Sequence, residues 1–318
     1  MDKLQLLKVL KERINNRAIR FPANLGIEEN NNIVRIDLTD SSVIANMQTD
    51  DAAFESWILC MKAILDDNQT EYRFALDWNP PVDLNNKHYQ RFLYRVFKFN
   101  TIFGGENGWF SLVQNNQLND LVIQYTPGNH FVMNSPTSNG TERINVEMNN
   151  EENMLENAII QNPTSLINLC NIRPPLERQL PVGVFRDVVA TVNAIFPHGH
   201  SAIDLWGIGN DNLLNIFELK IETNNGIGVL SELFFYTMLM DDVRNQRINL
   251  QNGANNLVNT EGIVSYILEQ RIQQRNCTFI HPMITEGVFV LLNNALQAHN
   301  IAFGSIVLDE TNNPVRII

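Results

Sequence analysis

The stretch from Ser201 to Asp242 constrains this chain more than any other part of its sequence. It holds two apolar runs, residues 202–208 and 213–221, joined by Gly209-Asn210-Asp211-Asn212. Glycine and asparagine tolerate the positive φ angles of tight turns, so the joint predicts a hairpin between two neighbouring strands. The spacing of apolar residues after the second run predicts an amphipathic helix over 229–243.

The polar residues of the two runs are expected to share one face of the sheet. Side chains of a strand alternate between its faces, so Glu218 and Lys220 point the same way. Phe217 and Leu219 then point into a core. If the hairpin loop has an odd number of residues, Asp204 lies roughly opposite Glu218. Two carboxylates and one amine would therefore meet on one exposed surface.

A cluster of this composition suits a divalent metal ion. Hard cations take oxygen ligands, and Mg²⁺ or Mn²⁺ keeps bound waters that can become nucleophiles. The lysine would orient the attacking water and stabilise the negative charge that develops. The alternative is an exposed cross-strand ion pair, worth only a few tenths of a kcal/mol to about 1 kcal/mol.

These residues resemble the motif of the PD-(D/E)xK, or restriction-endonuclease-like, nuclease superfamily. Asp204 takes the place of the first acid, Ile203 stands where that motif has proline, and Glu218-Leu219-Lys220 matches the (D/E)xK half. The resemblance covers roughly residues 170–308. It implies an α/β fold with a restriction-endonuclease-like mixed sheet flanked by helices in the C-terminal half.

The resemblance also implies an activity, which is divalent-metal-dependent hydrolysis of phosphodiester bonds. DNA is favoured over RNA as the substrate, in a restriction or defence system. Asp204 and Glu218 would hold Mg²⁺ or Mn²⁺, and Lys220 would orient the water. Because double-strand cutting by such folds generally needs two active sites, a homodimer is favoured.

Two further acids could join this site by their location. Some members of the superfamily use a carboxylate on the helix before the core sheet, a place that Glu177 would take. Members often carry Glu or Gln on the helix after it, which points to Glu232. For Glu177 the alternative is a surface ion pair with Arg173 or Arg178.

A catalytically inactive binding or regulatory protein with the nuclease fold is the alternative function. The net charge is −12, and nucleic-acid binding needs local positive surface. Two predicted helices, over 2–20 and 86–99, could supply that surface, or could simply pack against a core. Their basic residues are Lys3, Lys8, Lys11, Arg13, Arg17 and Arg20 in the first, and Lys87, His88, Arg91, Arg95 and Lys98 in the second.

The chain is expected to form two domains. Residues 1–135 would be an α+β domain for recognition, regulation or dimerisation, residues 136–165 a linker rich in Asn and acids, and residues 166–318 the nuclease-like domain. Further predicted elements are a helix over 50–65 capped by Thr49 or Asp50, strands over 32–40, 71–78, 109–113 and 120–125, a helix around 176–180, a helix over 284–298 and a strand over 301–308. Residues 262–268 fit a buried strand or the start of a helix that runs to residue 275, and the resemblance favours the strand.

Composition predicts a cytoplasmic protein with no membrane partner. No apolar run approaches the ~20 residues of a bilayer span, and the first residues form a charged amphipathic pattern rather than a signal peptide. Cys60, Cys170 and Cys277 form no CxxC motif, which predicts reduced thiols. His198 and His200 have no third His or Cys ligand nearby, so a zinc site is not indicated.

Overall fold

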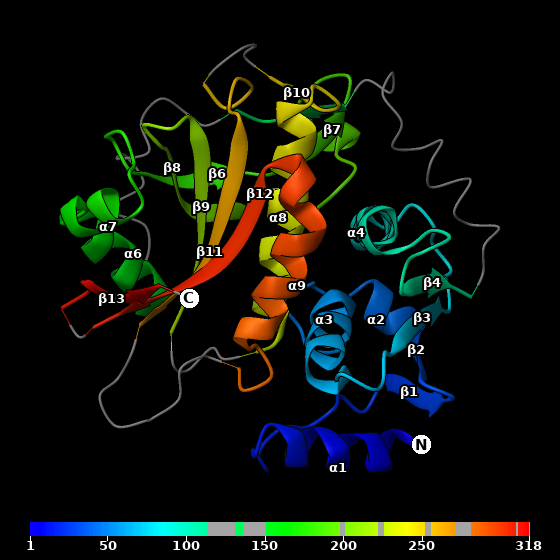
Figure 1. Ribbon diagram of the computed structural model, residues 1–318. Coiled ribbons are helices and arrows are strands. Elements are labelled where there is room, and N and C mark those ends of the chain that lie inside the picture. Colours follow the sequence, from blue (N-terminus) through cyan, green and yellow to red (C-terminus); the bar gives the residue numbers. More distant parts are fainter. Residues whose placement is uncertain are drawn as a thin grey trace. The chain divides into compact units, whose positions relative to one another are not determined.

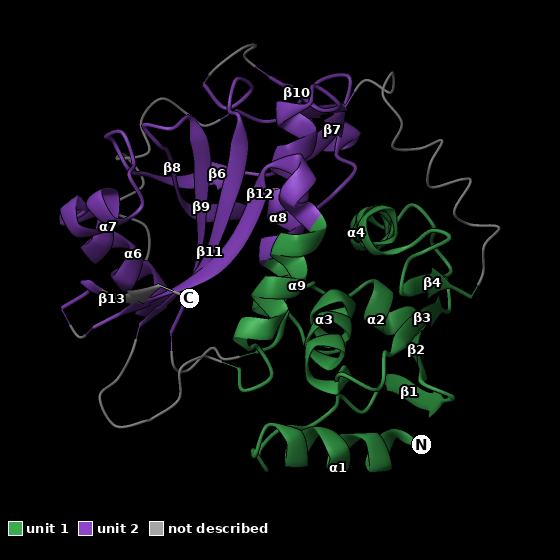
Figure 2. Ribbon diagram, in the orientation of Figure 1, with its two compact units in different colours: residues 1–129, 226–232, 281–295 green, residues 130–225, 233–280, 296–318 purple. Residues whose placement is uncertain are grey.

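The computed structural model describes residues 1–113, 131–135, 151–197, 201–221, 226–251, 256–270, 281–309 and 311–317. The protein is an α/β protein with mixed sheets flanked by helices (Figure 1). Its chain divides into two compact units (Figure 2). Unit 1 comprises residues 1–129, 226–232 and 281–295, and unit 2 comprises residues 130–225, 233–280 and 296–318.

Unit 1 is built on a four-stranded sheet. In order across the sheet its strands are β1 (Leu25–Asn30), β2 (Ile33–Leu38), β3 (Arg73–Trp78) and β4 (Phe110–Leu112). The first pair is an antiparallel hairpin whose turn residues Asn31 and Asn32 have φ of 52° and 63°, and the other two pairs are parallel. In β2, Val34, Ile36 and Leu38 alternate with more exposed residues. The predicted strands over 32–40, 71–78 and 109–113 are therefore confirmed.

Four helices from the described N-terminal part of unit 1 accompany this sheet. They are α1 (Lys3–Arg13), α2 (Asp40–Val43), α3 (Phe54–Leu65) and α4 (Lys87–Phe103), and the bounds of α1, α3 and α4 differ from the sequence prediction. α1 ends well before residue 20, because the chain turns at Asn15, where φ is 50°. α3 begins later than predicted, since the amide of Ala52 donates to the carbonyl of Thr49 (3.0 Å) in a separate turn.

Burial excludes the main basic residues of α4 from a nucleic-acid surface. Arg91, Arg95 and Lys98 are all buried. Arg95 forms an ion pair with the buried Glu55 of α3, and the Lys98 ammonium lies 5.5 Å from the centre of the Tyr94 ring. The core-packing interpretation of this helix is correct, because its aromatic residues bring the basic stems with them into the interior.

The basic residues of α1 that have described partners also serve the fold. The Lys3 ammonium donates to the carbonyls of Pro22 (2.5 Å) and Leu25 (2.6 Å). The Arg13 guanidinium donates to the carbonyl of Leu65 (2.6 Å), at the end of α3, where helix carbonyls lack intrahelical partners. These cations satisfy backbone acceptors of unit 1.

Unit 1 also takes residues from later in the chain. The amide of Ser231 donates to the Ser56 hydroxyl (2.8 Å), and the two hydroxyls lie 2.8 Å apart. The Ser231 hydroxyl also donates to Oε2 of Glu55 (3.0 Å). All three side chains are buried, so this polar network belongs to the interior of unit 1.

A six-stranded mixed sheet forms the centre of unit 2. In order across the sheet its strands are β13 (Pro314–Ile317), β12 (Ile301–Leu308), β11 (Gly262–Gln270), β9 (Leu213–Lys220), β8 (Ala202–Ile208) and β6 (Glu177–Pro181). β6, β8 and β9 are antiparallel neighbours, whereas β11 and β12 run parallel to β9. The predicted strands over 262–268 and 301–308 are confirmed. The predicted helix around 176–180 is wrong, because these residues pair with β8 as an edge strand.

The other elements of unit 2 surround this sheet. A smaller sheet has the strand order β10 (Asn249–Leu250), β5 (Phe131–Met133) and β7 (Val184–Arg186). The helices are α6 (Glu151–Gln161), α7 (Thr164–Leu169) and α8 (Gly228–Arg244), and α9 (Glu286–Leu296) falls largely in unit 1. The predictions for α8 and α9 are confirmed, whereas α6 and the start of α7 lie in the segment predicted as a linker. Residues 136–150 of that segment and the predicted strand over 120–125 lie outside the described residues.

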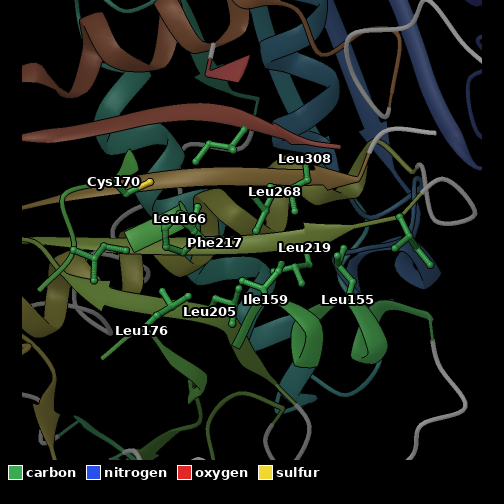
Figure 3. Packing of buried hydrophobic residues seen from close by; sticks show 13 residues of the cluster. Leu155, Ile159, Leu166, Cys170, Leu176, Leu205, Phe217, Leu219, Leu268 and Leu308 are labelled. Atoms are coloured by element: carbon green, nitrogen blue, oxygen red, sulfur yellow. The ribbon is translucent and has the colours of Figure 1, made fainter. Parts of the chain in front are cut away.

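An apolar cluster packs one face of the six-stranded sheet against α6 and α7 (Figure 3). Leu155 and Ile159 of α6 point toward Phe217 and Leu219 of β9 (Figure 3). Burial of each such side chain contributes about 1.5–3 kcal/mol. Because Leu219 is committed to this face, its neighbours Glu218 and Lys220 are held on the opposite face.

Within the described ranges, no helix combines the length and the apolar composition that a membrane span requires. Cys60 and Cys170 are both buried free thiols, and burial raises the pKa of the Cys170 thiol to about 12. Cys277 lies outside the described residues.

Candidate functional site

The hairpin of β8 and β9 brings the predicted acids together. Leu205 pairs with Phe217, and extending this register by one residue places Asp204 opposite Glu218. The backbone N–H of Leu219 donates to Oδ2 of Asp204 (2.8 Å). The turn contains Asn212 at φ 61°, a conformation that asparagine tolerates. Turn chemistry and register together therefore set the position of Asp204 beside β9.

Glu218 and Lys220 form a close ion pair on β9. The Lys220 Nζ lies 2.8 Å from Oε1 of Glu218. The two side chains are only 5% and 3% exposed, so the expectation of an exposed surface is wrong. β9 is a central strand of the mixed sheet, antiparallel to β8 and parallel to β11, and parallel pairing is typical of sheets that are covered on both faces. Asp204, nearer the edge, is half-buried.

Glu177 does not lie on a helix before the sheet. It begins the edge strand β6 and pairs with Trp206 of β8. Its proposed surface partner Arg178 instead pairs with the buried Glu156 of α6 (2.9 Å). Glu177 therefore does not take the place on a preceding helix that the resemblance implies, because its segment pairs with β8 as a strand.

Glu152 is a site residue that the sequence prediction missed. It lies in the first turn of α6, the helix that precedes the six-stranded sheet in the chain. Its Oε1 is 3.2 Å from the Nζ of Lys220. Acids at the start of a run with apolar residues at helical spacing indicate a helix N-terminus, and this signal was available at residues 151–159. The polar composition of the preceding residues obscured it.

Glu269 of β11 is a second missed acid. It lies beside Lys220 in the parallel register of β11 and β9, so the two residues occupy the same face of the sheet. Its Oε1 accepts a hydrogen bond from the buried hydroxyl of Ser305 on β12 (2.7 Å). A single acid in the otherwise apolar run of β11 was the available signal.

Glu232 lies in the part of α8 that belongs to unit 1. It is buried, and its Oε1 accepts a hydrogen bond from Nε2 of Gln48 (2.6 Å). This hydrogen bond connects α8 to the segment around Gln48 within unit 1. The part of Glu232 in the metal site stays a prediction.

Glu156 and Arg178 support the helix that carries Glu152. The Arg178 guanidinium donates through Nε and Nη2 to both oxygens of Glu156 (2.9 Å each), which is a bidentate arrangement. Burial raises the pKa of the Glu156 carboxyl, and the hydrogen bonds from Gln179 and Arg178 oppose that rise. The pair ties α6 to β6 beside the apolar cluster.

The donor set at the hairpin consists of carboxylate oxygens, which suit Mg²⁺ or Mn²⁺ better than softer metals that take Cys or His ligands. No group of three or more His, Cys, Asp or Glu placed to hold a metal ion occurs among the residues that the structure describes. Asp204 and Glu218 nonetheless supply two carboxylates, and Mg²⁺ is commonly bound by one or two carboxylates together with waters and substrate phosphates. His198 and His200 lie outside the described residues.

Comparisons of this chain with models of protein families, with curated proteins and with solved structures find no match. The function proposed for it rests on the side chains of β8, β9 and α6.

Proposed function

We propose that this protein is a divalent-metal-dependent nuclease of the PD-(D/E)xK kind that hydrolyses phosphodiester bonds, in DNA rather than RNA. The observation that carries the proposal is the meeting of two acids and a lysine on one hairpin. Oδ2 of Asp204 accepts a hydrogen bond from the backbone N–H of Leu219 (2.8 Å), and the Lys220 ammonium donates to Oε1 of Glu218 (2.8 Å). The two contacts support the proposal, because they connect Asp204 to β9 and Lys220 to Glu218 on adjoining strands.

The order of elements in unit 2 supports the same proposal. Helices α6 and α7 precede three antiparallel strands, β6, β8 and β9. Helix α8 follows, and β11 then joins the sheet parallel to β9. A core strand after the helix is what the resemblance to the restriction-endonuclease-like fold requires.

Each residue has a distinct part in the proposed reaction. Asp204 and Glu218 would hold Mg²⁺ or Mn²⁺, which when bound supplies positive charge at the phosphate and an acidified water. The Lys220 ammonium orients the attacking water and stabilises charge on the phosphate oxygens. The Leu219 amide fixes the Asp204 carboxylate, so that one of its oxygens has a defined direction. Glu152, rather than Glu177, is the acid of the preceding helix that reaches this lysine.

The decisive experiment is DNA cleavage by the full-length chain. Plasmid DNA, single-stranded DNA and RNA are incubated with the protein and Mg²⁺ or Mn²⁺, beside Lys220→Ala. Arg244→Met serves as the matched control, because it removes a cation from an ion pair of unit 2 (Arg244 to Asp241, 2.7 Å) without touching the motif. We expect cutting by the wild type and the control only. Cutting by Lys220→Ala at the wild-type rate would refute the assignment of Lys220 to the active site.

One observation favours a second candidate, a nuclease-fold protein that binds a partner without cleaving DNA. Glu218 and Lys220 are almost fully buried, which restricts the approach of a phosphate group to the ammonium. Calorimetric titration with Mn²⁺ separates the candidates. Mn²⁺ binding that disappears in Asp204→Asn supports the nuclease, whereas absence of both binding and cutting supports the second candidate.

A further inference from the structure

Lys220 lies between two carboxylates that differ in origin and exposure. Glu218 comes from the same strand, lies 2.8 Å from Nζ and is 3% exposed. Glu152 comes from α6, lies 3.2 Å from Nζ and is 24% exposed. Glu218 is almost fully buried beside the lysine, whereas Glu152 is partly exposed to solvent. Of these two ion pairs, the one with Glu152 is therefore the more open to exchange with an anion from solvent.

A phosphate oxygen is the natural competitor for such a contact. An ammonium group has three donors and binds carboxylate and phosphate oxygens alike through charge-assisted hydrogen bonds. Because Glu152 is the more exposed of these two acids, we expect an anion from solvent to approach Lys220 on the side that Glu152 occupies. A phosphate of the substrate and Glu152 would then require the same donor.

We infer that the Glu152 carboxylate occupies the position on Lys220 that a phosphate group of a nucleic acid takes, so that this acid competes with the substrate for the lysine. The inference rests on the proposed function and deepens it, because it identifies where the phosphate binds. It also differs from a metal-binding role for Glu152. A ligand to the metal would help substrate binding, whereas a competitor opposes it.

Binding without metal tests the inference separately from catalysis. Fluorescence anisotropy is measured with a fluorescein-labelled 20-mer, single-stranded and duplex, in EDTA and low salt. The variants are Glu152→Gln, which keeps the side-chain shape, Glu151→Gln, which removes the same charge one residue earlier in α6, and Glu152→Gln combined with Lys220→Met. We expect Glu152→Gln to lower the Kd about threefold, the size of one exposed ion pair. The Glu151 variant should change the Kd less, and the double variant should lose the gain.

Several results would overturn the inference. They are an unchanged or weaker affinity of Glu152→Gln, an equal gain in Glu151→Gln, a gain that persists without Lys220, or no measurable binding by the wild type and Glu152→Gln. Weaker Mn²⁺ binding by Glu152→Gln without tighter DNA binding would assign Glu152 to the metal instead. Tighter binding without any cutting in Mg²⁺ or Mn²⁺ supports the inference while the proposed catalysis fails. Cutting that depends on Lys220, without tighter DNA binding by Glu152→Gln, overturns the inference while the proposed catalysis holds.

Discussion

Removing the ammonium of Lys220 should destabilise the fold more than neutralising its partner. Lys220→Met keeps most of the side-chain volume but removes the cation 2.8 Å from Glu218, whose side chain is 3% exposed. Loss of one partner from a buried ion pair costs about 3–5 kcal/mol. The lysine is near the end of β9 and close to the partly exposed Glu152, so we expect the lower end, about 3 kcal/mol.

Neutralising Glu218 should have a smaller effect. Glu218→Gln leaves the lysine with the Glu152 carboxylate at 3.2 Å and with an amide oxygen that still accepts a hydrogen bond. We expect a loss of about 1–2 kcal/mol in the free energy of unfolding. The double variant should be more stable than the sum of the single effects predicts, with a coupling energy of about 1–2 kcal/mol.

Urea denaturation of the four proteins at pH 7, followed by circular dichroism, measures these differences. The midpoints should shift while the m-values stay constant, since the area exposed on unfolding is the same. A total stability of 5–15 kcal/mol, common for folded proteins, leaves the variants folded in water. A coupling energy below about 0.5 kcal/mol would refute the view that Lys220 and Glu218 interact in a buried environment. Equal effects of the two single variants would refute the compensation by Glu152.

Three further predictions concern unit 1, acid stability and assembly. Arg95→Met leaves the buried Glu55 without its cation and should lower the free energy of unfolding, measured with urea, by about 3–5 kcal/mol. Adding Glu55→Leu should recover much of this loss. No recovery would contradict the ion pair as the cause. Burial lowers the pKa of His281 from 6.5 to about 4, so the unfolded chain binds a proton at a higher pH than the native chain. The contribution of His281 to the free energy of unfolding is therefore present above pH 6.5 and is lost as pH falls from 6.5 to 4, by roughly 2–3 kcal/mol. His281→Gln should flatten this part of the curve of stability against pH. Parallel curves for the wild type and the variant would contradict this prediction. Light scattering after gel filtration should give the mass of a homodimer if the protein cuts both strands of DNA, and a monomer that cuts both strands would contradict this expectation.

The hairpin at the centre of unit 2 could be predicted from sequence because its signals are local. Alternation along 213–221 identifies Phe217 and Leu219 as core residues, and the asparagine-rich turn sets the register that brings Asp204 to β9. The burial of Glu218 and Lys220 could not be predicted in the same way. It depends on the segments that cover the face of the sheet to which these side chains point, and such segments come from distant parts of the chain.

Other predictions were wrong or incomplete because contacts with distant parts of the chain decide the outcome. The local preferences of residues 176–180 allow a short helix or a strand, and these residues form a strand because they pair with β8. α6 was predicted as part of a linker because the residues around it are rich in Asn and acids, although Leu155 and Ile159 are buried in the apolar cluster. The basic residues of α4 resembled a nucleic-acid surface until the partner of Arg95, Glu55 on α3, was known. Long-range partners of this kind leave little signal near the residue itself.

The discontinuity of unit 1 has a consequence for how the chain acquires its structure during synthesis. The Ser56 hydroxyl and the Glu55 carboxylate find partners at Ser231, and residues 281–295 belong to the same unit. A ribosome that has released only the first 135 residues has made the four-stranded sheet but not the segments that complete its unit. N-terminal domains commonly fold while the rest of the chain is still being made. Here, completion of the N-terminal unit must wait until residue 295 has emerged, and a fragment ending at residue 135 would expose surface that the full chain buries.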